Sequence, residues 1–133
     1  MARNELRVVA AVMQEGGKIL ICQRKKTDKH PLKWEFPGGK VEAEEELRSA
    51  LARELSEELA IAATIGSEIV RYEHQYAGRP PIVLIFFRVQ QWTGEPTNVI
   101  FEQIRWSTPE KLPSFDFLEG DIDFVRRLAR GEY

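Results

Sequence analysis

One helix of this chain breaks the rule that charged side chains face water. Residues 44–59 are good helix formers without Gly or Pro, and their acidic start suits the positive end of a helix dipole. On a helical wheel of about 100° per residue, with Glu54 at the origin, Leu51 lies at about 60° on the apolar face. Glu58 lies at about 40° in the same stripe, and Glu57 at about 300° on its edge. The helix therefore turns carboxylates as well as leucines towards the interior.

Clustered carboxylates on a covered face need a positive partner. They repel one another and lose hydration. A charge run on a solvated face is the alternative, which the wheel disfavours. Arg53 lies one turn before Glu57 and can pair with it, but one cation does not neutralise three acids. The chain holds one Cys and two His, so the oxygen ligands favour Mg²⁺ or Mn²⁺ over zinc.

Two neighbouring segments suit a phosphate ligand. Gly38 and Gly39 allow the backbone to approach a ligand or metal closely, although a tight turn into the helix is the alternative explanation. Residues 24–33 form a basic, polar stretch that we expect to be an exposed loop. Such a loop can collect phosphates, or it can simply increase solubility.

Composition narrows the remaining possibilities. A length of 133 residues favours one domain, and 43% hydrophobic with 30% charged residues is typical of a soluble protein with a core. The net charge of −2 argues against bulk attraction to nucleic acid or anionic membranes. Cys22 is the only cysteine and lies in an apolar run, so we expect a buried, inert thiol. The charged N-terminus is unlike a signal peptide, and no apolar run approaches the roughly 20 residues of a membrane span. A reducing cytoplasm is the expected location.

The order of the expected elements indicates the fold class. Apolar runs and turn signals predict strands at 6–13, 19–24, 69–76, 82–92 and 104–106, a helical turn at 109–112 and a second helix at 118–130. The first two strands form a hairpin through residues 15–18. We therefore expect an α/β or α+β domain with a mixed sheet covered by helices.

The acidic helix carries a long, fixed pattern. Gly39 is followed after five residues by Glu45, and after seven more by Arg53-Glu54-Leu55-Ser56-Glu57-Glu58-Leu59-Ala60-Ile61. This resembles the Nudix box at every position except the last glycine, which is Ala60 here. Residues 35–40, 92–96, 112–113 and 116–117 resemble the MutT-type branch of the family. The resemblance implies one Nudix domain over residues 1–133, an α/β/α sandwich with the mixed sheet between helices.

The resemblance also implies roles for individual residues. The metal ligands would be the side chains of Glu54, Glu57 and Glu58, the carbonyl of Gly39 and, on a later loop, Glu102. Glu54 and Glu102 are alternatives for the general base. Arg53 and Glu45 would orient the helix through a salt bridge, with Gly38 in a structural role. Ala60 would cost on the order of 1 kcal/mol if its position needs a positive φ.

Family members cleave nucleoside diphosphates linked to another group, and MutT-like members convert nucleoside triphosphates to monophosphate and pyrophosphate. On the substrate side we expect Arg24, Lys25, Glu35 and Lys40. Asp121 stands where the MutT-like pattern has an asparagine that reads oxidised guanine, although it can instead cap the last helix. Oxidised purines such as 8-oxo-dGTP are the first substrate expected, and cytidine triphosphates the second.

A noncatalytic Nudix-like binding module is the competing class. It has no need for the intact Arg53-Glu54 and Glu57-Glu58 pairs, so the sequence favours the enzyme. The expected partner is a small nucleotide, with neither a membrane nor a stable nucleic-acid partner. The chain is expected to be a monomer or a homodimer.

Overall fold

Two parallel strands form the centre of the protein. The computed structural model describes residues 5–133, and in it β1 (Leu6–Glu15) pairs with β7 (Ile82–Val89). Both strands have long, fully buried apolar stretches. A strand covered on both faces needs apolar side chains on both of its sides, so it does not alternate with polar residues.

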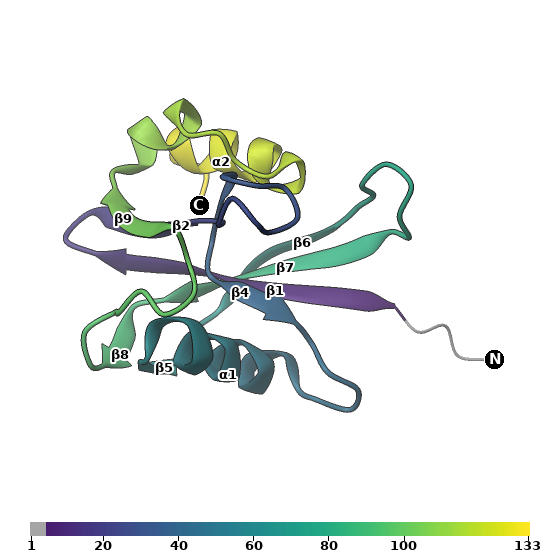
Figure 1. Ribbon diagram of the computed structural model, residues 1–133. Coiled ribbons are helices and arrows are strands. Elements are labelled where there is room, and N and C mark those ends of the chain that lie inside the picture. The colour runs from purple at the N-terminus through teal and green to yellow at the C-terminus, as the bar shows by residue number, and fades with distance from the viewer. Residues whose placement is uncertain (1–4) are drawn as a thin grey trace.

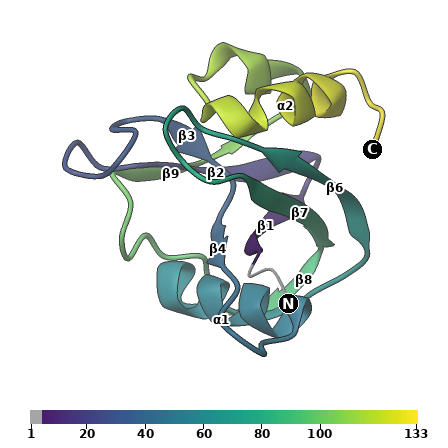
Figure 2. The same ribbon diagram turned by 90° about the vertical axis from the view of Figure 1, so that its right-hand side faces the viewer.

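The other strands extend this centre on both sides (Figure 2). Strand β6 (Glu68–His74) is antiparallel to β7, and β1 also pairs with β2 (Lys18–Gln23) and β4 (Gly38–Lys40). Strand β2 continues to β3 (Trp34–Glu35) and β9 (Gln103–Ser107). A small second sheet joins β5 (Ala62–Thr64) to β8 (Gln91–Thr93). The predicted β1–β2 hairpin is confirmed, with Gly16 and Gly17 both at positive φ in its turn.

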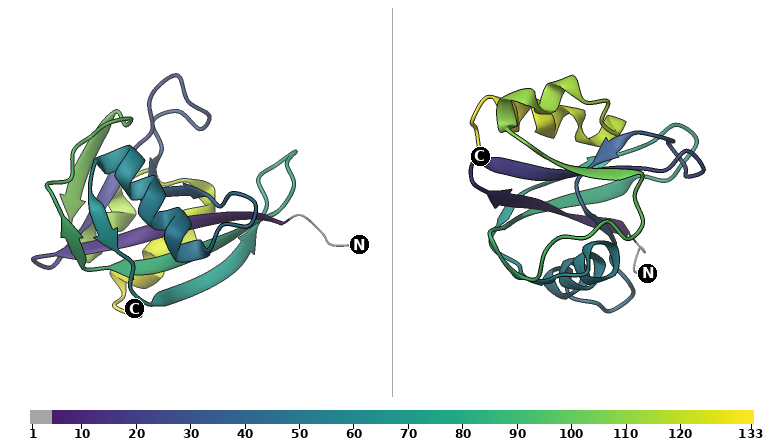
Figure 3. Two further views of the ribbon diagram at one scale, coloured as in Figure 1. Left: turned by 90° about the horizontal axis from the view of Figure 1, so that it is seen from below. Right: turned by 60° about the vertical axis from the view of Figure 1, so that its left-hand side comes forward.

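Helices cover the two faces of the sheet (Figures 1 and 3). Helix α1 (Leu47–Leu59) lies on one face. On the other lie α2 (Ile122–Ala129) and the 3₁₀ turns η1 (Pro109–Ser114) and η2 (Glu119–Asp121). Each interface has its own apolar core, and fully buried Cys22 belongs to the one beneath α1. Burial raises the pKa of the Cys22 thiol, which fits the inert role expected. The expected mixed sheet between helices is confirmed.

Several predicted boundaries were wrong. Helix α1 begins at Leu47, because Glu44 adopts a φ of 64° in the preceding loop. The first turn of α1 contains no acid, so the dipole explanation for the acidic start fails. The strand expected at 82–92 ends at Val89, and its last residues form β8 in the other sheet. The helix expected at 118–130 divides into η2 and α2. Within residues 5–133, no helix is long and apolar enough to cross a membrane.

Candidate active site

The inward face of α1 carries the acidic pair that the helical wheel predicts. Ala50, Leu51 and Leu55 are fully buried on this face, and Glu58 is 8% exposed among them. The Glu54 side chain is 14% exposed. Both carboxylates line one end of a pocket of about 520 Å³ that opens between α1, the middle of the sheet and the loops beneath η2.

The backbone of β4 passes directly against this pair. The Gly38 N–H donates a hydrogen bond to Glu58 Oε1 at 3.2 Å. A Cβ on Gly39 would lie 2.5 Å from the carboxyl carbon of Glu54, and one on Gly38 would overlap the carbonyl oxygen of Val9. Glycine is required at both positions because a side chain at position 39 would collide with Glu54 and one at position 38 with the backbone of β1. The segment is a strand instead of a tight turn, and its close approach to a ligand or metal stays a prediction.

The buried pair lacks a counter-charge sufficient to ionise both members. Burial, followed by the adjacent Glu54, raises the pKa of Glu58 to about 9, while the Gly38 N–H acts in the opposite direction. Without a cation, Glu58 therefore holds a proton at neutral pH and bonds to Glu54. Hard oxygen donors in this state fit Mg²⁺ or Mn²⁺, which can replace the proton as the positive partner.

Arg53 neutralises the opposite side of the helix. Its Nε and Nη2 donate to the two oxygens of Glu45 at 2.8 and 3.0 Å, which lowers the pKa of Glu45. Its Nη1 lies 3.1 Å from Glu54 Oε1 and 3.3 Å from Glu57 Oε2. The guanidinium also donates to the Lys40 carbonyl at 3.2 Å, which ties α1 to β4. The predicted Arg53–Glu45 salt bridge is thus present.

Of the remaining predicted ligands, Gly39 lines the pocket beside the pair, whereas Glu57 and Glu102 are not in its lining. Glu57 is 59% exposed and turns to Arg53. Glu102 is exposed, and its backbone N–H donates to the Gln23 carbonyl, while its neighbour Phe101 lines the pocket. Across residues 5–133, no three acidic, His or Cys side chains are arranged to hold a metal ion. Metal binding by Glu57, Glu102 and the Gly39 carbonyl stays a prediction.

Most of the predicted substrate residues line the same pocket. Arg24, Glu35 and Lys40 do so, and Arg24 Nη1 lies 3.1 Å from Glu35 Oε1. Burial raises the pKa of Glu35, and Arg24 opposes that rise. Lys25 is exposed outside the pocket lining, so its phosphate contact stays a prediction.

Asp121 also lines this pocket, together with aromatic and apolar side chains. It occupies the N-cap position of α2 but makes no side-chain capping hydrogen bond, which contradicts the capping alternative. The residue is 6% exposed, and burial together with the charge of Glu35 raises the pKa of Asp121 to about 8. Because this buried carboxyl group makes no capping hydrogen bond, it is available to a ligand.

Two tyrosines that the sequence analysis did not identify hold the turn before Asp121. The Tyr72 hydroxyl donates to the Gly120 carbonyl at 2.6 Å, and the Gly120 N–H donates to the Tyr76 hydroxyl at 3.2 Å. A Cβ on Gly120 would lie 2.9 Å from that hydroxyl, so the turn is tightly packed. The available signal was the period-two placement of Tyr72, His74 and Tyr76, which puts all three on one side of an extended segment.

Comparisons with known proteins agree with this geometry. The family model described as NUDIX domain matches residues 3–128. The chain is 37% identical over 120 residues to CTP pyrophosphohydrolase of Escherichia coli, covering 90% of this chain and 88% of that protein. It is 31% identical over 129 residues to 8-oxo-dGTP diphosphatase of Haemophilus influenzae, covering 96% and 94%. The solution structure of the E. coli ORF135 protein superposes with a TM-score of 0.82 at 35% identity, covering 92% of this chain and 86% of that one. The box glutamates on the inner face of α1 and the match along nearly the whole chain lead to one conclusion: this protein belongs to the Nudix hydrolase family.

Proposed function

We propose that this protein is a metal-dependent nucleoside triphosphate pyrophosphohydrolase that releases a nucleoside monophosphate and pyrophosphate. The observation that carries the proposal is the buried Glu54–Glu58 pair, which needs an external cation, at one end of a pocket that also contains Asp121. Glu54 and Glu58 would hold Mg²⁺ or Mn²⁺, together with Glu57, Glu102 and the Gly39 carbonyl. When bound, the metal neutralises phosphate charge and acidifies water.

Side chains of the protein supply the general base and the phosphate contacts. Glu54 is the better of the two candidate bases because it lines the pocket, whereas Glu102 is exposed beside it. Lys40 and Arg24 meet the phosphate oxygens, since both are cations in the pocket lining. Arg53 fixes the carboxylates of α1 relative to β4 and does not itself need to touch the substrate.

Asp121 would read the base, and its protonation decides what it can recognise. A neutral carboxyl group donates and accepts, as an asparagine does, while an ionised one only accepts. With a pKa of about 8, Asp121 is mostly neutral at pH 7. This supports 8-oxo-dGTP as the first substrate. Cytidine triphosphates are the second, because ionised Asp121 can accept from the cytosine amino group and a relative of this chain is named CTP pyrophosphohydrolase.

The biological role follows from this chemistry. Removing oxidised nucleotides before polymerases use them would protect DNA, so the protein would act in nucleotide sanitation and DNA repair. The lone buried thiol of Cys22 suits a reducing cytoplasm. We further infer that residues 1–133 form one Nudix domain, a monomer or homodimer whose partner is a small nucleotide instead of a stable nucleic acid.

One screen tests the proposal. The protein is incubated with Mg²⁺ and a panel of normal and oxidised nucleoside triphosphates, and pyrophosphate is resolved from orthophosphate. We expect monophosphate and pyrophosphate, with the highest kcat/KM for 8-oxo-dGTP. Primary release of orthophosphate and a diphosphate contradicts the reaction, and full turnover in excess chelator contradicts the metal. Tight nucleotide binding without turnover identifies a binding module instead.

A further inference from the structure

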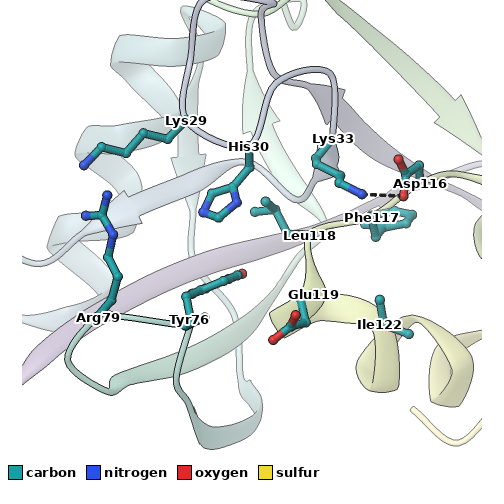
Figure 4. A pocket seen from close by; sticks show the side chains of 11 residues that line it. Lys29, His30, Lys33, Tyr76, Arg79, Asp116, Phe117, Leu118, Glu119 and Ile122 are labelled. Carbon is teal, nitrogen blue, oxygen red and sulfur yellow. Dashed lines mark hydrogen bonds and ion pairs between the residues drawn. The ribbon is translucent and has the colours of Figure 1, made fainter.

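A second pocket lies beside the active-site pocket (Figure 4). It has a volume of about 560 Å³, within the range of about 300–1,000 Å³ that small-molecule sites occupy. The two pockets share His30, Tyr76 and Leu118 as lining residues, but Glu54 and Glu58 belong only to the first. We call this second space the outer pocket.

Two cations line the outer pocket. Lys29 comes from the loop between β2 and β3, and Arg79 from the loop between β6 and β7, and their charged groups extend to the same side (Figure 4). Among residues 5–133, the ion pairs that form within 4.0 Å include neither Lys29 nor Arg79, whereas Lys33 pairs with Asp116 at 2.8 Å. Glu119 faces His74, with 3.1 Å between Oε1 and Nε2. Lys29 and Arg79 therefore bring two positive charges to the lining of the outer pocket, and neither forms an ion pair within residues 5–133.

Both cations are attached to hydrogen-bonded backbone. Arg24 Nε donates to the Lys29 carbonyl at 2.6 Å, and Arg24 is itself held by Glu35 of the active-site pocket. The Arg79 N–H donates to the Tyr76 carbonyl at 3.0 Å, and the Arg79 carbonyl accepts from Gln75 Nε2 at 2.9 Å. Hydrogen bonds thus hold the backbone that carries both cations in its two loops.

Apart from Glu119 and the Lys33–Asp116 ion pair, the rest of the outer pocket is lined by aromatic and apolar side chains. The rings of His30 and Tyr76 lie 4.9 Å apart between centroids, and Leu118 and Ile122 complete this side. Partial burial and the nearby Arg24 and Arg79 charges lower the pKa of His30, so its ring is neutral at pH 7. His30 adopts a left-handed φ of 52°, a strained conformation that often occurs at functional sites.

We propose that the outer pocket binds a nucleotide unit, with its phosphate on Lys29 and Arg79 and its base against Tyr76 and Leu118. Phosphate oxygens remove the repulsion between the two cations, and a planar base stacks on the aromatic wall. The unit is either the second nucleotide of a longer substrate that starts in the active-site pocket or a separate nucleoside monophosphate.

Binding without turnover tests the pocket itself. Equilibrium dialysis with CMP and with dGMP is carried out on the Mg²⁺-loaded wild type and on the Lys29→Gln/Arg79→Gln double variant. We expect the double variant to bind one equivalent fewer, or to bind that equivalent at least about tenfold more weakly, the scale of a lost charge-assisted hydrogen bond. The control is Lys26→Gln/Lys111→Gln, which removes the same charge from exposed lysines outside the pocket and should bind like the wild type.

Kinetics then identify the source of the nucleotide. The ratio of kcat/KM for a 5′-triphosphorylated dinucleotide to that for the matching mononucleotide is measured for the same proteins. A fall of at least about tenfold in the double variant alone assigns the pocket to a longer substrate, and an unchanged ratio assigns it to a separate nucleotide. Identical binding curves for the double variant and its control overturn the proposal. Because dialysis needs no catalysis, this result is independent of the proposed reaction.

Discussion

Glutamate side chains on the two sides of helix α1 have opposite electrostatic environments. On the outer side, Arg53 contacts Glu45, Glu54 and Glu57 within 3.3 Å, so the positive charge comes from the chain. On the inner side, Glu58 is buried beside Glu54 and receives only one backbone N–H. Hydrogen bonds from Arg53 lower the pKa of Glu45, whereas burial raises the pKa of Glu58 to about 9.

This contrast separates structural acids from acids that await a ligand. A carboxylate that already has an arginine gains little from a metal, while a buried one without a cation gains a great deal. Glu54 belongs to both groups because it touches Arg53 and bonds to Glu58. Glu54 therefore links the side of the helix that Arg53 neutralises to the side on which Glu58 is buried. The following predictions test this division.

The largest expected effect comes from Glu58→Gln. The variant removes a ligand charge, so kcat should fall roughly 1,000-fold, the value of several kcal/mol of lost charge stabilisation. It should fold normally, and its metal-free Tm should equal or exceed that of the wild type because glutamine, unlike Glu58, does not have to take up a proton to be buried beside Glu54. Steady-state kinetics and thermal melts with and without Mg²⁺ measure both. Glu46→Gln, an exposed acid just before α1, is the control and should change neither value.

Glu57→Gln sharpens the division between the two sides. As a metal ligand, Glu57 must leave Arg53, and its loss should lower kcat severely as well. Loss of kcat with unchanged folding supports ligation. Activity equal to that of the wild type would place Glu57 with the structural acids of the outer side.

Asp121→Asn extends the comparison to another buried acid of the pocket. Asparagine matches neutral Asp121 but not the ionised form. We expect the ratio of kcat/KM for 8-oxo-dGTP to that for CTP to change by at least about tenfold at pH 9, the scale of one buried hydrogen bond. The change should be smaller at pH 7, since the pKa of Asp121 is about 8. If Asp121→Asn only lowers the Tm and leaves the ratio unchanged at both pH values, Asp121 does not read the base.

The pH dependence of stability reports the same buried charge. Glu58 ionises near pH 4.5 in the unfolded chain but near pH 9 when folded. The unfolded state therefore loses its proton first, and the free energy of unfolding of the metal-free protein should fall between these values. Mg²⁺ should reverse this trend by favouring the ionised carboxylate. Thermal melts at pH 5, 7 and 9, in chelator and in Mg²⁺, measure the effect, and Glu58→Gln should flatten the chelator curve. A Tm that rises with pH in chelator would contradict it.

The smallest effect concerns the end of α1. Ala60 adopts a left-handed φ of 57°, and its N–H donates to the Ser56 carbonyl. Ala60→Gly should raise the free energy of unfolding by about 1 kcal/mol because glycine adopts this conformation without strain. Chemical denaturation measures it. The matched control Ala62→Gly, in strand β5, should instead lose stability, and a destabilised Ala60→Gly would mean that the conformation is not strained.

The parts of the protein that depend on local pattern were predictable from the sequence. The inward placement of Glu58 follows from spacing along one helix, while the Arg53–Glu45 pair and the strain at Ala60 were expected from the resemblance to the Nudix box. The break after Val89 was not predicted, because the first Gly after Val89 is Gly94, although the chain changes sheets before Gln91. Periodicity reports which residues are buried but not which sheet buries them.

Long-range contacts were equally unpredictable from the sequence. The hydrogen bonds of Tyr72 and Tyr76 with Gly120 join segments more than 40 residues apart, and no local signal links these segments. The same limit applies to Glu102, whose expected role depends on how a variable loop folds back. The structure leaves it exposed, beside the pocket lining.

The parallel pairing at the centre of the sheet also governs how the protein is made. Leu6 pairs with Ile82 and Met13 with Val89, so β1, which is synthesised before β7, has no central partner until β7 has been made. The long loop between β1 and β7 must close before the contacts between these strands contribute any stability, and this slows folding. Until β7 has been synthesised, the apolar surfaces of β1 and α1 stay exposed, and this nascent stage is where the chain is most open to aggregation and to chaperones.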